Sequence, residues 1–164
     1  MKHVINRANQ ILQQYGNDLD RITESLGLFV VYEKLNGRMR EIYFRDSIVI
    51  NEDISKREKR ELIAHAIAHH LLHAGNHMAM QKRIYSFGNH HEKQANIFAA
   101  CLLMPSDKFQ KILKNRPRMD EIANYFQVTE ELVRLRMMIW ASYEKPKKVT
   151  RGKNELPRIS SSIN

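Results

Sequence analysis

Apolar residues recur every three or four positions near the start of the chain, which is the period of an amphipathic helix. The stripe consists of Val4, Ile5, Ala8, Ile11, Leu12 and Tyr15. Gly16 can end this helix, because glycine readily adopts the left-handed conformation of a helix C-cap. The same period predicts a second short helix over residues 19–26, ended by Gly27.

Residues 28–51, with the sequence LFVVYEKLNGRMREIYFRDSIVIN, are rich in the β-branched and aromatic side chains that favour strands. Asn36-Gly37 supplies the positive φ angles of a tight hairpin turn, and Asp46-Ser47 can turn the chain into the last strand, SIVIN. We therefore predict a small sheet of three antiparallel strands. The edge of such a sheet can bind an extended peptide.

A long helix is predicted after the sheet, because Ser55 and Glu58 have the spacing of a capping box. Nothing interrupts this helix before Gly75. Shorter helices are expected over residues 90–104, 106–114, 119–126 and 129–143, with Pro105 and Pro117 between them. The pattern predicts an α+β fold with a single domain over residues 1–143 and a basic, disordered tail over residues 144–164.

The composition agrees with one ordinary domain. A chain of 164 residues with 43% hydrophobic residues can bury a core without disulfides, which excludes a collagen, a disulfide scaffold and a fully disordered chain. The longest apolar run, residues 97–104, is far shorter than the roughly 20 residues of a bilayer span. The start of the chain has no apolar signal region, and the single cysteine, Cys101, is expected to be a buried thiol. We therefore expect a cytoplasmic protein.

The formal net charge of +9 suggests nucleic acid or an acidic partner. Much of the excess lies in the tail, where residues 144–164 contain six Lys/Arg and two Glu. The tail could contact DNA weakly and without sequence preference, although a solvated, flexible end explains the same residues. The basic residues concerned are Lys145, Lys147, Lys148, Arg151 and Lys153.

Seven of the eight histidines lie within residues 65–91. His65 and His69 are four residues apart on the long predicted helix, so both imidazoles leave the same face one turn apart, as a tetrahedral Zn²⁺ requires. Such a pair alone is more often a solvated or packed pair. Glu92, in the next helix, can supply a third ligand if the two helices pack together. Two histidines and one glutamate leave a coordination position for water, as in hydrolytic zinc sites.

Other polar residues near His65, His69 and Glu92 have less support as parts of a metal site. Asn96 lies one turn beyond Glu92, so its carbonyl could accept the spare N–H of a ligand histidine and orient the ring; a helix-surface asparagine is the alternative. His70 and His73 point to other faces of the helix and are interpreted as packing or supporting residues. Tyr85 and His90 are candidates to stabilise an oxyanion or contact substrate.

The strings RELIAHAIAHHLLH and HEKQANIFAACLLMP resemble the ImmA/IrrE family of zinc-dependent peptidases. The resemblance implies a zincin-like, gluzincin-like core with one zinc ion on His65, His69 and Glu92. It also implies an anti-repressor role, in which the enzyme cuts a helix-turn-helix repressor and derepresses genes of a phage, a mobile element or a stress response.

The chain departs from this family at Ala66, where such peptidases have the glutamate that takes a proton from the attacking water. We therefore expect this chain to be inactive or nearly so. Two explanations fit: alanine was introduced to trap a complex, or the natural protein is a metal-binding pseudo-peptidase. The selective loss of the proton shuttle, by exchange for the best helix former, favours the first.

Residues 118–143 have the spacing of a helix-turn-helix, which makes a DNA-binding regulator that acts by binding alone a competing hypothesis. The turn contains Gln127 where such motifs often use glycine. Glu130 and Glu131 begin the second helix, where bases would be read and where acidic groups would repel phosphate. A structural or repressor-docking role is therefore preferred.

Overall fold

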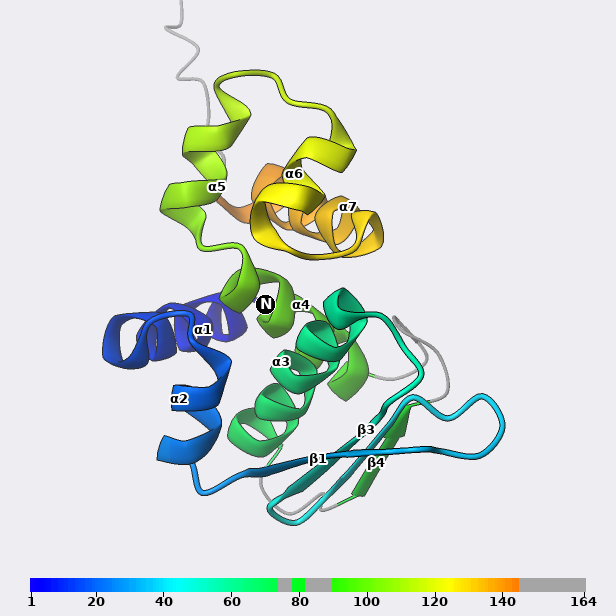
Figure 1. Cartoon of the computed structure of the whole chain (residues 1–164). Coiled ribbons are helices and arrows are strands. Elements are labelled where there is room, and N and C mark those ends of the chain that lie inside the picture. Colours follow the sequence, from blue (N-terminus) through cyan, green and yellow to red (C-terminus); the bar gives the residue numbers. More distant parts are fainter. Residues whose placement is uncertain (74–77, 82–89, 145–164) are drawn as a thin grey trace, which may run out of the picture.

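The computed structural model describes residues 1–73, 78–81 and 90–144. Its elements are α1 (Lys2–Tyr15), α2 (Leu19–Ser25), β1 (Phe29–Glu33), β2 (Glu41–Phe44), β3 (Ser47–Asn51), α3 (Lys56–Leu72), β4 (Met78–Gln81), α4 (His90–Leu103), α5 (Ser106–Leu113), α6 (Met119–Phe126), α7 (Glu130–Ile139) and a π-helical turn, Trp140–Glu144. Figure 1 shows the sheet at one end of the molecule and α5 to α7 at the other, with α3 and α4 between them. The predicted α+β class is confirmed.

The helices begin and end close to the predicted residues, because their signals are local. Gly16 ends α1 with a φ of 77°. The capping box of Ser55 and Glu58 is present at the start of α3, with each side chain bonded to the backbone N–H of the other residue. This helix ends at Leu72 rather than at Gly75, which lies outside the described residues.

The sheet has a different pairing from the one predicted. The strand order is β1-β3-β2-β4, so β3 lies between the two strands that the Asn36-Gly37 turn was expected to join. β1 pairs with β3 in parallel, whereas β2 is antiparallel to both β3 and β4. The predicted antiparallel pair of β2 and β3 is present, but the predicted pairing of β1 with β2 and the number of strands were wrong. The seven residues between β1 and β2 are enough to carry the chain past the most buried strand, and a local turn does not decide which strands pair.

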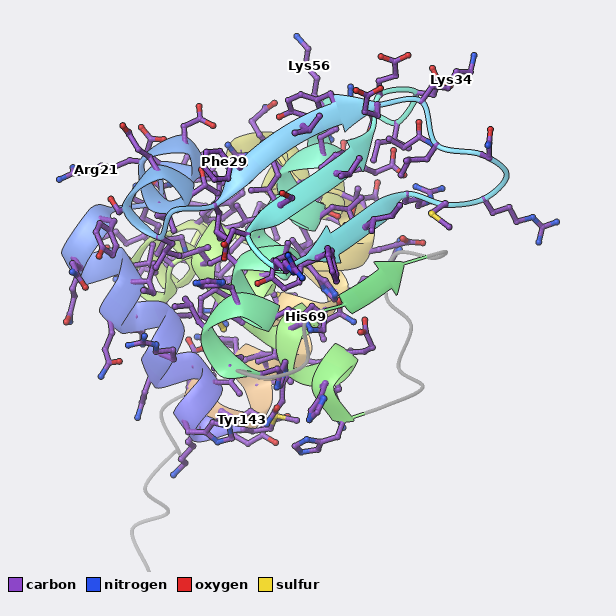
Figure 2. All side chains as sticks on the ribbon, turned by 90° about the horizontal axis from the view of Figure 1, so that it is seen from below. Arg21, Phe29, Lys34, Lys56, His69 and Tyr143 are labelled. Atoms are coloured by element: carbon purple, nitrogen blue, oxygen red, sulfur yellow. The ribbon has the colours of Figure 1, made fainter. Side chains whose placement is uncertain are left out.

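α3 lies at the centre of the molecule and packs against β3, α2 and α4. Every residue from Glu61 to His69 is buried, which requires neighbours on all sides of the helix. On the sheet, Tyr43, Ile48 and Ile50 are buried. Phe29 on β1 is 67% exposed, and Figure 2 shows it on the side of the molecule opposite to Tyr143.

α6 and α7 form the helix-turn-helix-like pair that the spacing predicted. Gln127 takes the left-handed conformation, with a φ of 56°, and thus fills the role that glycine has in many such turns. The first turn of α7 contacts α3: the Glu61 carboxylate accepts hydrogen bonds from the backbone N–H and the Oγ1 hydroxyl of Thr129. Arg57 of α3 donates to the backbone carbonyl of Val128. The start of α7, which would face DNA in a helix-turn-helix protein, is therefore hydrogen-bonded to α3.

No helix in the described part of the chain has the length and apolar character needed to cross a bilayer. The predicted basic tail beyond Glu144 lies outside the described residues.

Candidate metal centre

Two histidines of α3 and one glutamate of α4 bring potential ligand atoms to one point. The Nε2 atoms of His65 and His69 are 3.0 Å apart. Oε2 of Glu92 is 3.2 Å from Nε2 of His65, and Oε1 is 3.3 Å from Nε2 of His69. One ligand atom from each residue lies within 4.8 Å of the other two. The structure thus brings together the three residues that the sequence proposed as metal ligands.

The helices themselves explain this convergence. The four-residue spacing puts both imidazoles on the same face of α3, because 3.6 residues make one turn. α4 packs along α3 and is buried from Gln94 to Leu103, which holds its first turn beside the histidines. Glu92 lies in that first turn, where the partial positive charge of the helix N-terminus favours a carboxylate. In Figure 2, His69 lies in the interior, between the outer strands and the helices below them.

Asn96 supports the first histidine from the opposite side of its ring. Its Oδ1 atom is 2.9 Å from Nδ1 of His65, and both side chains are buried. A carbonyl oxygen can only accept, so the ring proton of His65 is on Nδ1. Nε2 of the same ring then faces Glu92 and His69: it donates to the Glu92 carboxylate when the ring is doubly protonated, and it presents a lone pair when the ring is neutral. This is the arrangement that fixes the tautomer and direction of metal-binding histidines.

The electrostatics of the cluster keep its carboxylate ionised. Burial by itself would raise the pKa of Glu92, but hydrogen bonds with His65 and His69 and the charges of these rings outweigh burial and hold this pKa well below its usual range. Two imidazole nitrogens at 3.0 Å with a carboxylate beside them form a nitrogen and oxygen donor set suited to Zn²⁺. The residues present therefore fit a divalent cation.

Ala66, between the two histidines in the sequence, is fully buried and presents only a methyl group. No carboxylate extends from this position, which is where the family resemblance implies a general base. The helix itself is undisturbed, in agreement with the high helix propensity of alanine.

The neighbouring histidines of α3 have structural partners. Nδ1 of His70 is 2.9 Å from the hydroxyl of Tyr43 on β2. The ring of His73 stacks on that of His91 with centroids 4.1 Å apart. Burial, with the nearby charges of His91 and His69, lowers the pKa of His73 to about 4. These contacts agree with the packing role predicted for both.

Of His90 and Tyr85, the two residues predicted to stabilise an oxyanion or contact substrate, only His90 lies within the described structure. His90 is exposed at the start of α4, and its ring contacts that of His91. Tyr85 lies outside the described residues.

Two residues of β2 near the cluster were missed by the sequence analysis. The ring of Tyr43 stacks on that of His69 with centroids 6.5 Å apart. Glu41 is 1% exposed, and neither carboxylate oxygen has a hydrogen-bond partner within the described structure. One signal was available: in EIYF, the acid and the tyrosine alternate and so share a face of the strand.

The helix with two histidines, the adjoining sheet and the acidic residue on the next helix define a zincin-like metallopeptidase fold. Residues 23–138 match the Peptidase_M78 family model, described as the IrrE N-terminal-like domain. The chain is also similar to the phage-like element PBSX protein XkdA of Bacillus subtilis (strain 168), with 31% identity over 125 residues. That alignment covers 73% of this chain and 61% of the relative.

The chain therefore belongs to the IrrE N-terminal-like family, as the resemblance to ImmA/IrrE peptidases implied. This is a family of zinc-dependent metallopeptidases. The chain spans less than two thirds of the length of the phage-element relative.

Proposed function

We propose that this protein is a zinc metalloendopeptidase of the anti-repressor type, with the ion held by His65, His69 and Glu92. The observation that carries the proposal is the convergence of these three ligand atoms within 4.8 Å. The hydrogen bond from His65 to Asn96 supports it, because it presents the Nε2 lone pair to the ion.

Zinc, when bound, would polarise the scissile carbonyl and make water a stronger nucleophile at neutral pH. The protein's own contribution is to fix the ligands. The buried histidines have little freedom to turn away, and the Glu92 carboxylate is partly exposed, so substrate can approach from that side.

Ala66 limits the rate. A general base typically contributes 10²- to 10⁴-fold, and a methyl group cannot accept a proton. We infer that the chain cleaves slowly and that the substitution Ala66→Glu raises the rate by roughly this factor.

The substrate is proposed to be an extended segment of a helix-turn-helix repressor. β4 is at one end of the strand order, next to β2, so an extended peptide could add to the sheet along it. The similarity to a phage-element protein supports a role in derepressing phage, mobile-element or stress genes, which would take place in the cytoplasm.

DNA binding by α6 and α7 is less well supported. The first turn of α7 is bonded to Glu61 of α3, and Glu130 and Glu131 begin this helix with negative charge. We therefore propose that the pair is structural or contributes to repressor docking.

Contact of the basic tail with DNA, weak and without sequence preference, stays a proposal about residues outside the described structure.

The test uses zinc-loaded protein with and without Ala66→Glu. Each form is incubated with purified helix-turn-helix repressors of the source genome, and products are identified by mass spectrometry. We expect Ala66→Glu to cut one repressor at one bond, and His65→Ala in the same background to abolish both the cleavage and the bound zinc. Absence of cleavage by zinc-loaded Ala66→Glu would refute the peptidase proposal and leave the pseudo-peptidase hypothesis.

A further inference from the structure

Glu41 is a buried acid that the metal centre as described does not use. It begins β2, it is 1% exposed, and both of its carboxylate oxygens lack hydrogen-bond partners within the described structure. Burying such a group without a partner is unfavourable, so its presence in a folded protein calls for an explanation. The explanation offered by the packing is that this carboxyl faces the reaction site.

The contacts between β2 and α3 place Glu41 along the helix. Near the start of the strand, Arg40 forms an ion pair with Glu58 in the first turn of α3. Further along the strand, the Tyr43 hydroxyl contacts His70 near the end of α3. The strand and the helix therefore run in the same direction.

These two contacts place Glu41 over the part of α3 between Glu58 and His70. Glu41 and Tyr43 share one face of β2 and are two residues, or about 7 Å, apart along it. Ala66 and His70 share one face of α3 and are one turn, about 6 Å, apart. Ala66, where only a methyl group extends from the helix, lies within this part of α3.

The charges of the cluster act on this carboxyl, as expected from that position. Burial raises the pKa of Glu41 to about 8, the charge of His69 lowers it and the charge of Glu92 raises it. The acid is thus within electrostatic reach of two of the three proposed ligands.

We propose that Glu41 is the proton acceptor for peptide hydrolysis in this chain, in place of the side chain that Ala66 lacks. The inference rests on the proposed function. The oxygen of the attacking water forms a bond to the scissile carbonyl carbon while one proton of that water passes to Glu41 in its ionised form, which the metal-free protein populates as the pH rises through about 8. The C–N bond then breaks, and the proton passes from Glu41 to the leaving nitrogen, which restores the carboxylate.

The activity test compares Glu41→Gln in two backgrounds. The substrate is the repressor that zinc-loaded Ala66→Glu cleaves. In the chain with Ala66, we expect Glu41→Gln to lower the residual rate by roughly 10²-fold, as loss of a general base does. In the Ala66→Glu background, where a second carboxylate is available, the loss should be at least ten-fold smaller. Glu33→Gln, the same exchange at an exposed position of β1, is the matched control.

Two measurements do not depend on activity. Zinc affinity should change by less than about three-fold in Glu41→Gln, whereas loss of a ligand or of its support would lower it by ten-fold or more. In metal-free protein, Glu41→Gln and Ala66→Glu should have non-additive effects on the urea midpoint at pH 8, because adjacent carboxylates repel each other. The same cycle with Glu33→Gln should be additive.

Each outcome has a distinct meaning. If Ala66→Glu cuts no repressor, the proposed function fails and this inference fails with it. If Ala66→Glu cuts but the chain with Ala66 has no residual rate, or has a rate that Glu41→Gln does not change, only the role of Glu41 is refuted. The role of Glu41 would also be refuted if Glu41→Gln lowered the cleavage rate equally in both backgrounds. A large loss of zinc affinity in Glu41→Gln, or additive effects on the urea midpoint, would refute it as well.

Discussion

Nδ1 of His65 and Oδ1 of Asn96 are 2.9 Å apart in the interior, on the side of the imidazole away from Glu92. The two residues are on different helices, so this contact orients the ring by reference to α4 as well as α3. The orientation of His65, a proposed ligand, therefore depends on how α3 and α4 pack on each other.

Asn96→Ala should lower zinc affinity by roughly ten-fold or more, because the ring of His65 would lose the acceptor that fixes its tautomer. Asn96→Asp is the matched control, since it keeps an acceptor oxygen. It also removes the amide Nδ2, which is buried and has no hydrogen-bond partner among the described residues. Competition titration with a chromophoric chelator measures the zinc affinity of both variants. Unchanged affinity in Asn96→Ala would remove this residue from the site.

The stability of the metal-free protein should fall as the pH rises, through Glu41. Burial raises the pKa of this group from 4.5 to about 8, so between these values the folded state binds a proton that the unfolded state releases. The contribution is fully present below pH 4.5 and is lost as the pH rises through 8, by up to about 5 kcal/mol. Urea unfolding at several pH values should show this slope in the parent and in Glu33→Gln. A slope that is just as steep in Glu41→Gln would contradict the assignment.

Removing the Glu61 carboxylate should detach the first turn of α7 from α3. This group accepts hydrogen bonds from the backbone N–H and the hydroxyl of Thr129 and is 2% exposed. Glu61→Ala should therefore lower the free energy of unfolding by about 3 kcal/mol, as expected for charge-assisted bonds. Glu131→Ala, in the exposed part of the same turn, should cost less than about 0.5 kcal/mol. Equal effects in urea unfolding would show that the contact adds no stability.

Cys101 should resist alkylation in the folded protein. Its side chain is 1% exposed, and burial raises the pKa of the thiol to about 12, so almost no thiolate is present at pH 8. Iodoacetamide labelling followed by mass spectrometry should detect modification only after addition of urea. Rapid labelling of native protein would mean that α4 opens readily.

Much of the helical structure was predictable because its signals lie within a few residues of one another. The capping box at Ser55 and Glu58 determines where α3 begins. The spacing of His65 and His69 puts both rings on one side of this helix by backbone geometry alone. Glu92 could be proposed as their partner because its helix is apolar enough to require packing on another.

The sequence by itself determined the helices, the α+β class and the three residues that converge at the candidate metal centre, since each depends on local periodicity or on a short motif. Only the tertiary structure decided the strand order, because hydrogen bonds between strands join residues whose spacing in the chain carries no pattern. That order puts Glu41 of β2 over the part of α3 between Glu58 and His70. A single acid in a short strand has the same local pattern whether it faces solvent or a buried site, and packing alone makes the difference.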